Sequence, residues 1–554
     1  MGLRQRAGRS RLKRRQARVS IAVMTVRLRR LFRNSAFLVG LTAFLAAFVV
    51  QSGELGTSDT THRLQTTHSF WTSEPPVNPD DYPEFGIHGR GGRVYSWYGV
   101  GQSLLMLPAD IVGTYVGNLA LFDGYDDDPQ PRSIVVSYST NILVCVLATL
   151  VCFRLLGLLG FTANQRIAGA LALLFCTTFL HYTQNMMENN YILLLTLTGL
   201  TYQYEWLRTG SRRALVAGSC ALGLNLLTRL TTGMDLLAVG FFVVLVTLLT
   251  SVGGGGLRSR FGEYGKIALP VYAAFFLIDR LYQYYRFGSF FNTYLDVFAR
   301  EQKMLNPDLP AAYPFETPFH VGFFGALFKP EKSIFLFDPL LVLTLLVALL
   351  AWRRFQPEIR AYLIAFAALL LAYITFYAKF AVWSGDFAWG DRYVSTSAQI
   401  LAFMSVPLLM RHRADVDAIV WRIGLALVAV SAVVQVASVM FWCPLEIYQM
   451  ETLGHPTFVI WLRMKNIVAF ALGKMDAWGL NNRAMTQDPW DHVHITTYNF
   501  LPFLLARVGT AAAWVVHLMT AVWFAALGAL VAVLEFVRRS AKRGVWEAAT
   551  SRLV

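Results

Sequence analysis

An aspartate followed by an arginine four residues later stands just after the first long apolar run of the chain. These are Asp59 and Arg63, within residues 57–65, which read Thr-Ser-Asp-Thr-Thr-His-Arg-Leu-Gln. Thr57 or Ser58 can cap a helix there, because a hydroxyl oxygen accepts the free amide hydrogens of a first turn. On that helix the two charged side chains would meet, and the arginine would keep the acid ionised, as a base or a metal-binding carboxylate must be. A capped, salt-bridged surface helix would show the same pattern.

A second acid, Glu188, lies between two apolar runs in the segment Met-Met-Glu-Asn-Asn-Tyr of residues 186–191. Ionisable residues at membrane depth are costly and commonly face a cavity or a charged partner. Glu188 is therefore a second candidate catalytic residue, and a simple polar turn remains the alternative.

The most specific pattern is the loop of residues 383–393, Trp-Ser-Gly-Asp-Phe-Ala-Trp-Gly-Asp-Arg-Tyr. It combines glycines with Asp386, Asp391, Trp389 and Arg392. Such a loop can hold a phosphate and a sugar together, because a guanidinium donates charge-assisted hydrogen bonds to phosphate oxygens. An anchored loop with internal salt bridges is the alternative interpretation.

Long apolar runs must position these segments. The chain has 554 residues, of which 55% are hydrophobic and only 15% charged, a composition that excludes a string of soluble domains. We therefore expect an all-α polytopic membrane protein with about twelve transmembrane helices, since about twelve runs are long enough to cross a bilayer. They lie near residues 35–51, 133–153, 165–183, 189–206, 214–231, 233–251, 266–283, 334–352, 361–380, 395–410, 420–442 and 506–536.

The basic residues predict the orientation of these helices. If the first run leaves the cytoplasm, the connections rich in Arg and Lys all fall inside, with both termini cytoplasmic. Twelve Arg and Lys in residues 1–34, where there is no acid, account for most of the formal charge of +15. A basic tail beside an inserting helix meets anionic lipid, so the charge does not call for nucleic acid.

This topology divides the chain into a basic cytoplasmic tail, two membrane parts and a second tail, with the candidate residues on the outer side. The first tail is residues 1–34, and the membrane core is residues 35–410, with outer loops at 52–132, 284–333 and 381–394. The C-terminal membrane helices are residues 411–537, with an outer loop at 443–505, and the second tail is residues 538–554. Aromatic residues crowd the outer loops, as in an interfacial belt. Some of them could instead stack on a sugar or line a lipid groove. Among them are Trp71, Tyr95, Trp97, Tyr98, Trp383, Trp389 and Trp461.

With these motifs in place, the chain resembles the C-type superfamily of integral-membrane glycosyltransferases, which includes protein O-mannosyltransferases and aminoarabinose and lipopolysaccharide-core sugar transferases. The resemblance covers most of residues 35–410. It rests on Asp59, on residues 95–104 (Tyr-Ser-Trp-Tyr-Gly-Val-Gly-Gln-Ser-Leu) ahead of Pro108, on residues 286–289 (Arg-Phe-Gly-Ser), on residues 328–335 (Phe-Lys-Pro-Glu-Lys-Ser-Ile-Phe) and on residues 389–393 (Trp-Gly-Asp-Arg-Tyr).

The resemblance implies transfer of a hexosyl or pentosyl group from a polyprenyl phosphate on the extracytoplasmic side. Asp59 would be the base, and Arg392, then Lys329 or Lys332, would bind the donor phosphate. Arg63, Asp386, Asp391, Trp389 and Tyr98 would support them. Many relatives carry two adjacent acids in the first outer loop, whereas Asp59 is flanked by Ser58 and Thr60, which leaves Glu54 as a substitute base.

The expected partners are a polyprenyl-phosphate-linked sugar, membrane lipids and a glycan, lipid or protein acceptor, in a bacterial inner (plasma) membrane with the site facing outward. The sequence establishes no cofactor and leaves open whether the protein requires a divalent cation. A transporter or lipid flippase is the rival class, and a catalytically inactive relative is a third. Transporters generally place ionisable residues at mid-membrane, whereas the candidates here lie in outer loops, which favours an enzyme.

Overall fold

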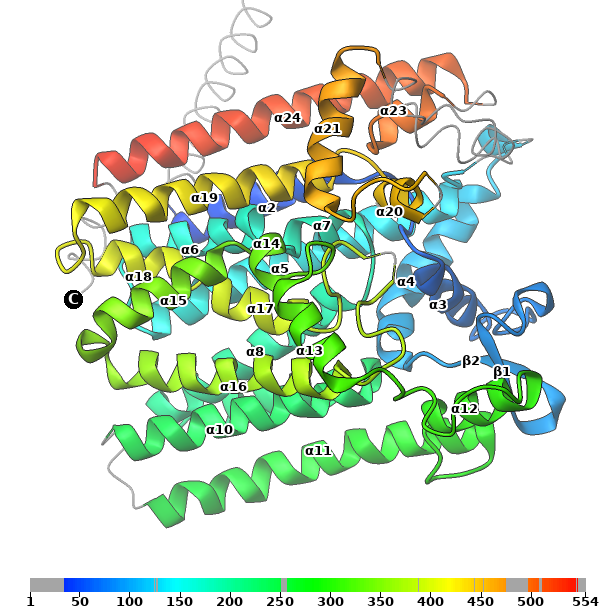
Figure 1. Cartoon of the computed structure of the whole chain (residues 1–554), viewed down its shortest axis with the longest axis horizontal. Helices are drawn as coiled ribbons and strands as arrows, with labels where there is room; N and C mark the ends of the chain where they lie inside the picture. Colours follow the sequence, from blue (N-terminus) through cyan, green and yellow to red (C-terminus); the bar gives the residue numbers. More distant parts are fainter. Residues whose placement is uncertain are drawn as a thin grey trace, which may run out of the picture.

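The computed structural model describes residues 34–123, 125, 128–250, 257–386, 388–442, 444–451, 453–474, 497–507, 511–544 and 546. Nearly all of the predicted basic tail and part of the predicted outer loop 443–505 lie outside this range. Long helices run side by side through the molecule, and a smaller group of short elements gathers at one end of them (Figure 1).

The bundle contains both long and short helices. Those of twelve or more residues in the bundle are α2 (Ser35–Val50), α5 (Pro131–Leu158), α6 (Ala163–Cys176), α8 (Asn189–Thr209), α9 (Arg212–Thr228), α10 (Gly233–Leu249), α11 (Leu257–Phe287), α15 (Leu340–Ala351), α16 (Pro357–Tyr377), α19 (Ala418–Ser438), α21 (Val459–Ala471) and α24 (Ala513–Lys542). The shorter ones are α7 (Phe179–Gln184), α13 (Phe319–Phe328), α14 (Ile334–Phe337), α17 (Ser395–Ala402), α18 (Ser405–Arg411), α20 (Pro444–Glu451) and α23 (Leu501–Leu505).

Six helices in the described part of the chain are long and apolar enough to cross a membrane, which makes this an integral membrane protein. They are Pro131–Leu158, Leu230–Leu249, Ser259–Phe287, Pro357–Tyr377, Ala418–Ser438 and Ala513–Lys542, and Ser35–Val50 and Phe319–Phe328 are shorter apolar helices. The predicted all-helical class is confirmed, whereas twelve crossings and the orientation of the termini stay predictions.

At least three of the predicted crossings are broken helices, and one of them, 334–352, divides into α14 and α15. The run 165–183 divides into α6 and α7 because Thr177 adopts an extended conformation, with φ −131° and ψ 164°. The run 395–410 divides into α17 and α18, and Pro407 lies just after the break. Proline has no N–H to donate to the carbonyl four residues earlier, so a continuous helix is disfavoured there. Apolar length alone therefore overcounted the continuous helices.

The largest buried cluster joins α5, α6, α8, α10 and α16. Within it the rings of Phe242 and Tyr362 meet edge to face, 6.4 Å apart, across α10 and α16. This packing fixes the connection after α9 and the loop after α16, which carry two of the arginines described below.

The group at the end of the bundle consists of α3 (Ser58–His68), β1 (Gly86–His88), β2 (Val94–Ser96), α4 (Val100–Gly117) and α12 (Tyr294–Leu305) (Figure 1). The two strands are antiparallel, with Ile87 opposite Tyr95. Helix α12 is held to β1 by Glu301, which accepts hydrogen bonds from the backbone N–H of His88 (2.9 Å) and pairs with its ring (2.7 Å). We call these elements the end module.

Helix α3 begins as predicted. Thr57 is its N-cap, and its hydroxyl oxygen accepts the backbone N–H of Thr60 at 3.3 Å. The Thr60 hydroxyl in turn donates to the carbonyl of Met186. This contact fixes the first turn of α3, with Asp59, beside the turn that carries Glu188.

Candidate active site

A cavity of about 360 Å³ lies between the end module and the bundle. Residues of α3, the β2–α4 connection, the α9–α10 connection, α11, α12, α16 and the 381–394 loop line it. The lining side chains include Asp59, Arg63, Glu84, Phe85, Trp97, Tyr98, Glu188, Arg229, Asp279, Arg280, Tyr294, Phe298, Tyr313, Tyr377, Asp386, Arg392 and Tyr393. The structure therefore brings Asp59, Arg63, Tyr98, Glu188, Asp386 and Arg392 together, as the sequence predicted.

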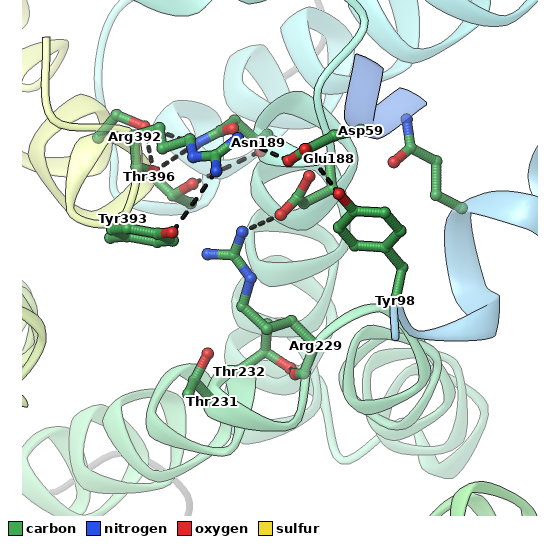
Figure 2. Close-up of polar contacts among 12 residues, drawn as sticks. Asp59, Tyr98, Glu188, Asn189, Arg229, Thr231, Thr232, Arg392, Tyr393 and Thr396 are labelled. Carbon is green, nitrogen blue, oxygen red and sulfur yellow. Dashed lines mark hydrogen bonds and ion pairs between the residues drawn. The ribbon is translucent and has the colours of Figure 1, made fainter. Parts of the chain in front are cut away.

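Asp59 uses both carboxylate oxygens. The Tyr98 hydroxyl donates to Oδ1 at 2.6 Å, and Nη1 of Arg392 donates to Oδ2 at 2.7 Å. Figure 2 shows Tyr98 and Arg392 approaching this carboxylate from two sides. A backbone contact keeps Tyr98 there: a Cβ on Gly99 would lie 2.3 Å from the carbonyl oxygen of Thr228, so only glycine permits this approach to the end of α9.

The partners of Asp59 set its charge. Burial by itself raises the pKa of Asp59, but the charges of Arg392 and Arg63 and the Tyr98 hydrogen bond outweigh it and hold the pKa at about 2. The carboxylate is consequently ionised at neutral pH. The same arrangement, with burial as the larger cause, raises the pKa of Tyr98 well above its ordinary value, so Tyr98 remains a donor.

Glu188 forms a separate ion-pair centre. It is 2% exposed, lies 2.8 Å from Nη2 of Arg63 and also pairs with Arg229. The predicted pairing of Asp59 with Arg63 is therefore wrong. Arg63 turns to Glu188 and stacks on the Tyr98 ring, with its guanidinium carbon 4.0 Å from the centroid. Glu188 therefore lies between two guanidinium groups and can position both.

Arg392 reaches Asp59 from a loop that the glycines shape. Gly385 and Gly390 have φ of 75° and 74°, a region that favours glycine. A Cβ on Gly385 would lie 2.5 Å from Cγ of Arg392, so the loop folds closely over that side chain. Asn189, beside Glu188, donates to the carbonyl of Arg392 (2.6 Å) and to the Ser395 hydroxyl (2.7 Å). The loop is thereby tied to the start of α8 (Figure 2).

Lys332 is hydrogen-bonded to the backbone of the same 381–394 loop. It is 7% exposed, and its ammonium donates to the carbonyls of Asp386 (2.6 Å), Ala388 (3.0 Å) and Gly390 (3.3 Å). It does not line the cavity, so it is placed to support the loop rather than to bind a phosphate. Asp391 is also buried, which raises its pKa to about 7, and it accepts the backbone N–H of Tyr393.

We expect Lys332→Met to loosen the loop at residues 381–394. Hydrogen bonds from a charged donor contribute about 1.5–3 kcal/mol each, so amide exchange of the loop should accelerate by about tenfold or more. The transfer rate of Lys332→Met should also fall, because Arg392 belongs to the loosened loop. Hydrogen-exchange mass spectrometry checks this, with the exposed Lys379→Met as the control. Unchanged exchange in Lys332→Met would contradict the supporting role.

Trp389 and Lys329, like Lys332 and Asp391, do not line the cavity. Trp389 is fully buried between Phe337, His181 and Arg463, at 5.1 Å, 6.0 Å and 5.2 Å, and the Tyr182 hydroxyl donates to its carbonyl. It anchors the loop and cannot stack on a sugar here. Lys329 is half exposed outside the cavity lining, 3.7 Å from Glu331 and above the Trp383 ring.

The sequence analysis missed Arg229. It lies between α9 and the short helix η4 (Leu230–Thr232), pairs with Glu188 and sits 5.2 Å from the centre of the Tyr393 ring. A signal was present, because Arg229 is a cation at the outer end of a predicted crossing, where the positive-inside rule predicts few.

Cations outnumber anions among the paired groups. Arg63, Arg229 and Arg392, which we call the arginine cluster, are neutralised directly by only Asp59 and Glu188. Within the described part of the chain, Nη1 of Arg63 and Nε of Arg392 have no hydrogen-bond partner. Unpaired buried donors are costly, and an anion is the ligand that would satisfy them.

Within the described residues, no group of three or more His, Cys, Asp or Glu side chains converges as the ligands of a metal ion would. Asp59 and Glu188 are instead engaged by arginines.

No protein-family model and no curated protein sequence matches this chain. Among solved structures, its fold is similar to the apo oligosaccharyltransferase of Archaeoglobus fulgidus, with a TM-score of 0.43 and 12% identity over 73% of this chain and 55% of that one. It is also similar to ArnT from Cupriavidus metallidurans bound to undecaprenyl phosphate, with a TM-score of 0.41 and 14% identity over 85% of this chain and 75% of that one. The chain thus spans about half the length of the oligosaccharyltransferase.

Proposed function

We propose that this protein is a membrane glycosyltransferase that moves one sugar from a polyprenyl-phosphate carrier to an acceptor on the extracytoplasmic side of a bacterial inner membrane. The observation that carries the proposal is the Asp59 carboxylate, held between Tyr98 and Arg392 at a cavity with an arginine cluster. A base and a phosphate site side by side are what transfer from a phosphate leaving group requires.

The arginine cluster would bind the donor phosphate. Its three guanidinium groups face two carboxylates, so the cluster has a surplus of positive charge and unpaired donors. As the bond between the anomeric carbon and the phosphate oxygen breaks, its electron pair passes to that oxygen. Guanidinium groups already in place stabilise this charge without having to reorganise.

Asp59 would accept the proton of the acceptor hydroxyl as its oxygen attacks the anomeric carbon. A carboxylate with a pKa of about 2 is a weak base. A phosphate bound by Arg392 would compete with Asp59 for that guanidinium and add negative charge nearby, and both effects raise the pKa of Asp59. The base would then reach its full strength only when the donor is bound.

A pH profile tests this coupling. Because the pKa of Asp59 is depressed, kcat/KM for wild type should show no acid limb from Asp59 between about pH 4 and pH 8. In Arg392→Gln the main lowering charge is lost while burial remains, so the pKa should rise to its ordinary value of 3.8 or above and an acid limb should enter this range. Arg392→Lys keeps the charge and should keep the flat profile. Identical profiles for wild type and Arg392→Gln would refute the coupling.

The proposal itself is tested by transfer in liposomes from a panel of radiolabelled polyprenyl-phosphate sugars, with cell-envelope extract as the acceptor. Release of label from at least one carrier is expected. If folded protein releases sugar from none of them, the transferase proposal falls.

A further inference from the structure

The cavity has two unlike ends, with Asp59 between them. On one side of Asp59 lies Arg392, and its neighbour Tyr393 also contacts Arg229, whereas Arg63, the third arginine, stacks on the Tyr98 ring. On the other side Tyr98 leads to Trp97, whose ring centre is 5.8 Å from that of Tyr98. The proposed donor site assigns no role to this second end.

The second end is lined by a continuous run of four aromatic rings. Phe85 and Trp97 are 6.3 Å apart, Trp97 and Phe298 are 4.9 Å apart, and Phe298 and Tyr313 are 6.1 Å apart. All four are half-buried and line the cavity. We call Phe85, Trp97, Phe298 and Tyr313 the aromatic wall. The exposed carboxylate residue Glu84 lines the cavity beside it.

The position of the wall distinguishes it from an interfacial belt. Three of its rings come from the end module or the segment leading into it, which lies at one end of the apolar bundle (Figure 1). A carrier lipid chain would be expected nearer the bundle, where Phe315 packs on Phe376 of α16 and on Phe380 just after it, each 5.8 Å away. A carrier lipid bound near Phe315 would therefore leave the aromatic wall unoccupied.

Transfer chemistry also places the acceptor at this end. In an in-line displacement the nucleophile and the leaving group occupy opposite faces of the carbon atom. With the phosphate at Arg392, on the opposite side of Asp59 from Tyr98, the acceptor hydroxyl would reach Asp59 from the Tyr98 side. A sugar ring suits that side, because its C–H face packs on the negative face of an aromatic ring while its hydroxyls donate to an acid such as Glu84.

We infer that the aromatic wall is a carbohydrate-binding subsite and that the acceptor of this transferase is a glycan. The inference rests on the proposed function for the direction of transfer. The subsite itself requires only that the wall bind a neutral sugar ring.

The test is saturation-transfer NMR on the full chain in detergent micelles, without donor. The probes are neutral oligosaccharides of galactose, mannose and arabinose, and a peptide rich in Ser and Thr. Wild type should saturate the ring protons of at least one oligosaccharide. Trp97→Ala and Phe298→Ala, which alter two different elements, should each weaken that binding by about tenfold. Trp97→Phe, which keeps a ring, should restore most of it.

Phe291→Ala is the matched control, because Phe291 is an aromatic residue of the same region that is 92% exposed and does not line the cavity. Its oligosaccharide binding should equal that of wild type. Folded wild type that binds none of the three oligosaccharides, or only the peptide, would overturn the inference, as would equal binding by Phe298→Ala. If oligosaccharide binds through the wall but no donor sugar is ever released, the subsite stands and the transferase proposal falls. If sugar is transferred only to peptide or lipid, the transferase proposal stands and the glycan acceptor inference falls.

Discussion

Asp59→Asn should lower the rate of sugar transfer by about 10² to 10⁴-fold, the range expected for loss of a general base. Asparagine has nearly the shape of aspartate and its amide oxygen can still accept from Tyr98 or Arg392, but it cannot take the proton of an acceptor hydroxyl. The measurement is the release of labelled sugar from a polyprenyl phosphate by equal amounts of purified wild-type and variant protein.

The control for this prediction is Asp80→Asn, which removes an exposed acid of the same outer segment that does not line the cavity. Its transfer rate should match that of wild type. Thermal unfolding of both variants separates catalysis from folding. Retained transfer by Asp59→Asn would assign the base to another acid, with Glu54 as the first alternative.

Glu188→Gln should cause the largest loss of stability in the cavity. Glu188 and Arg63 are 2% and 4% exposed, and Arg229 pairs with the same carboxylate. Removing one partner of a buried ion pair typically costs about 3–5 kcal/mol, because the remaining charge is left buried without compensation. Here two guanidinium groups lose their shared counter-ion. Unfolding by SDS titration in mixed micelles measures the change.

Glu205→Gln is the matched control on the same helix. Glu205 pairs with Arg154 at 2.6 Å, but Arg154 is half exposed, and exposed ion pairs contribute about 1 kcal/mol or less. A Glu188→Gln protein as stable as Glu205→Gln would show that Glu188 is not the counter-ion of the cluster. The burial of Glu188 at the start of α8 would then need another explanation.

Several parts of the site could be predicted from local sequence. Thr57 caps α3 as its hydroxyl requires, and the glycines of the 381–394 loop mark positions with positive φ. The candidate residues Asp59, Glu188, Asp386 and Arg392 were each recognisable as polar groups in outer segments of an apolar chain, and all four line one cavity. The roles of Trp389 and Lys332 were not recognisable, because an indole or an ammonium in a loop has the same sequence signal whether it faces a ligand or is buried among its neighbours.

The sequence by itself determined that this is a helical membrane protein and which polar segments its helices must carry, because apolar length and charge distribution are local properties. Only the tertiary structure decided how the charges pair. The spacing of Asp59 and Arg63 favours a pair within α3, but such a pair contributes only about 0.2–0.5 kcal/mol on a helix. Removing one partner of a buried pair such as Arg63–Glu188 costs several times more. Arg63 therefore turns to Glu188, and Asp59 pairs with Arg392, which lies 333 residues further along the chain.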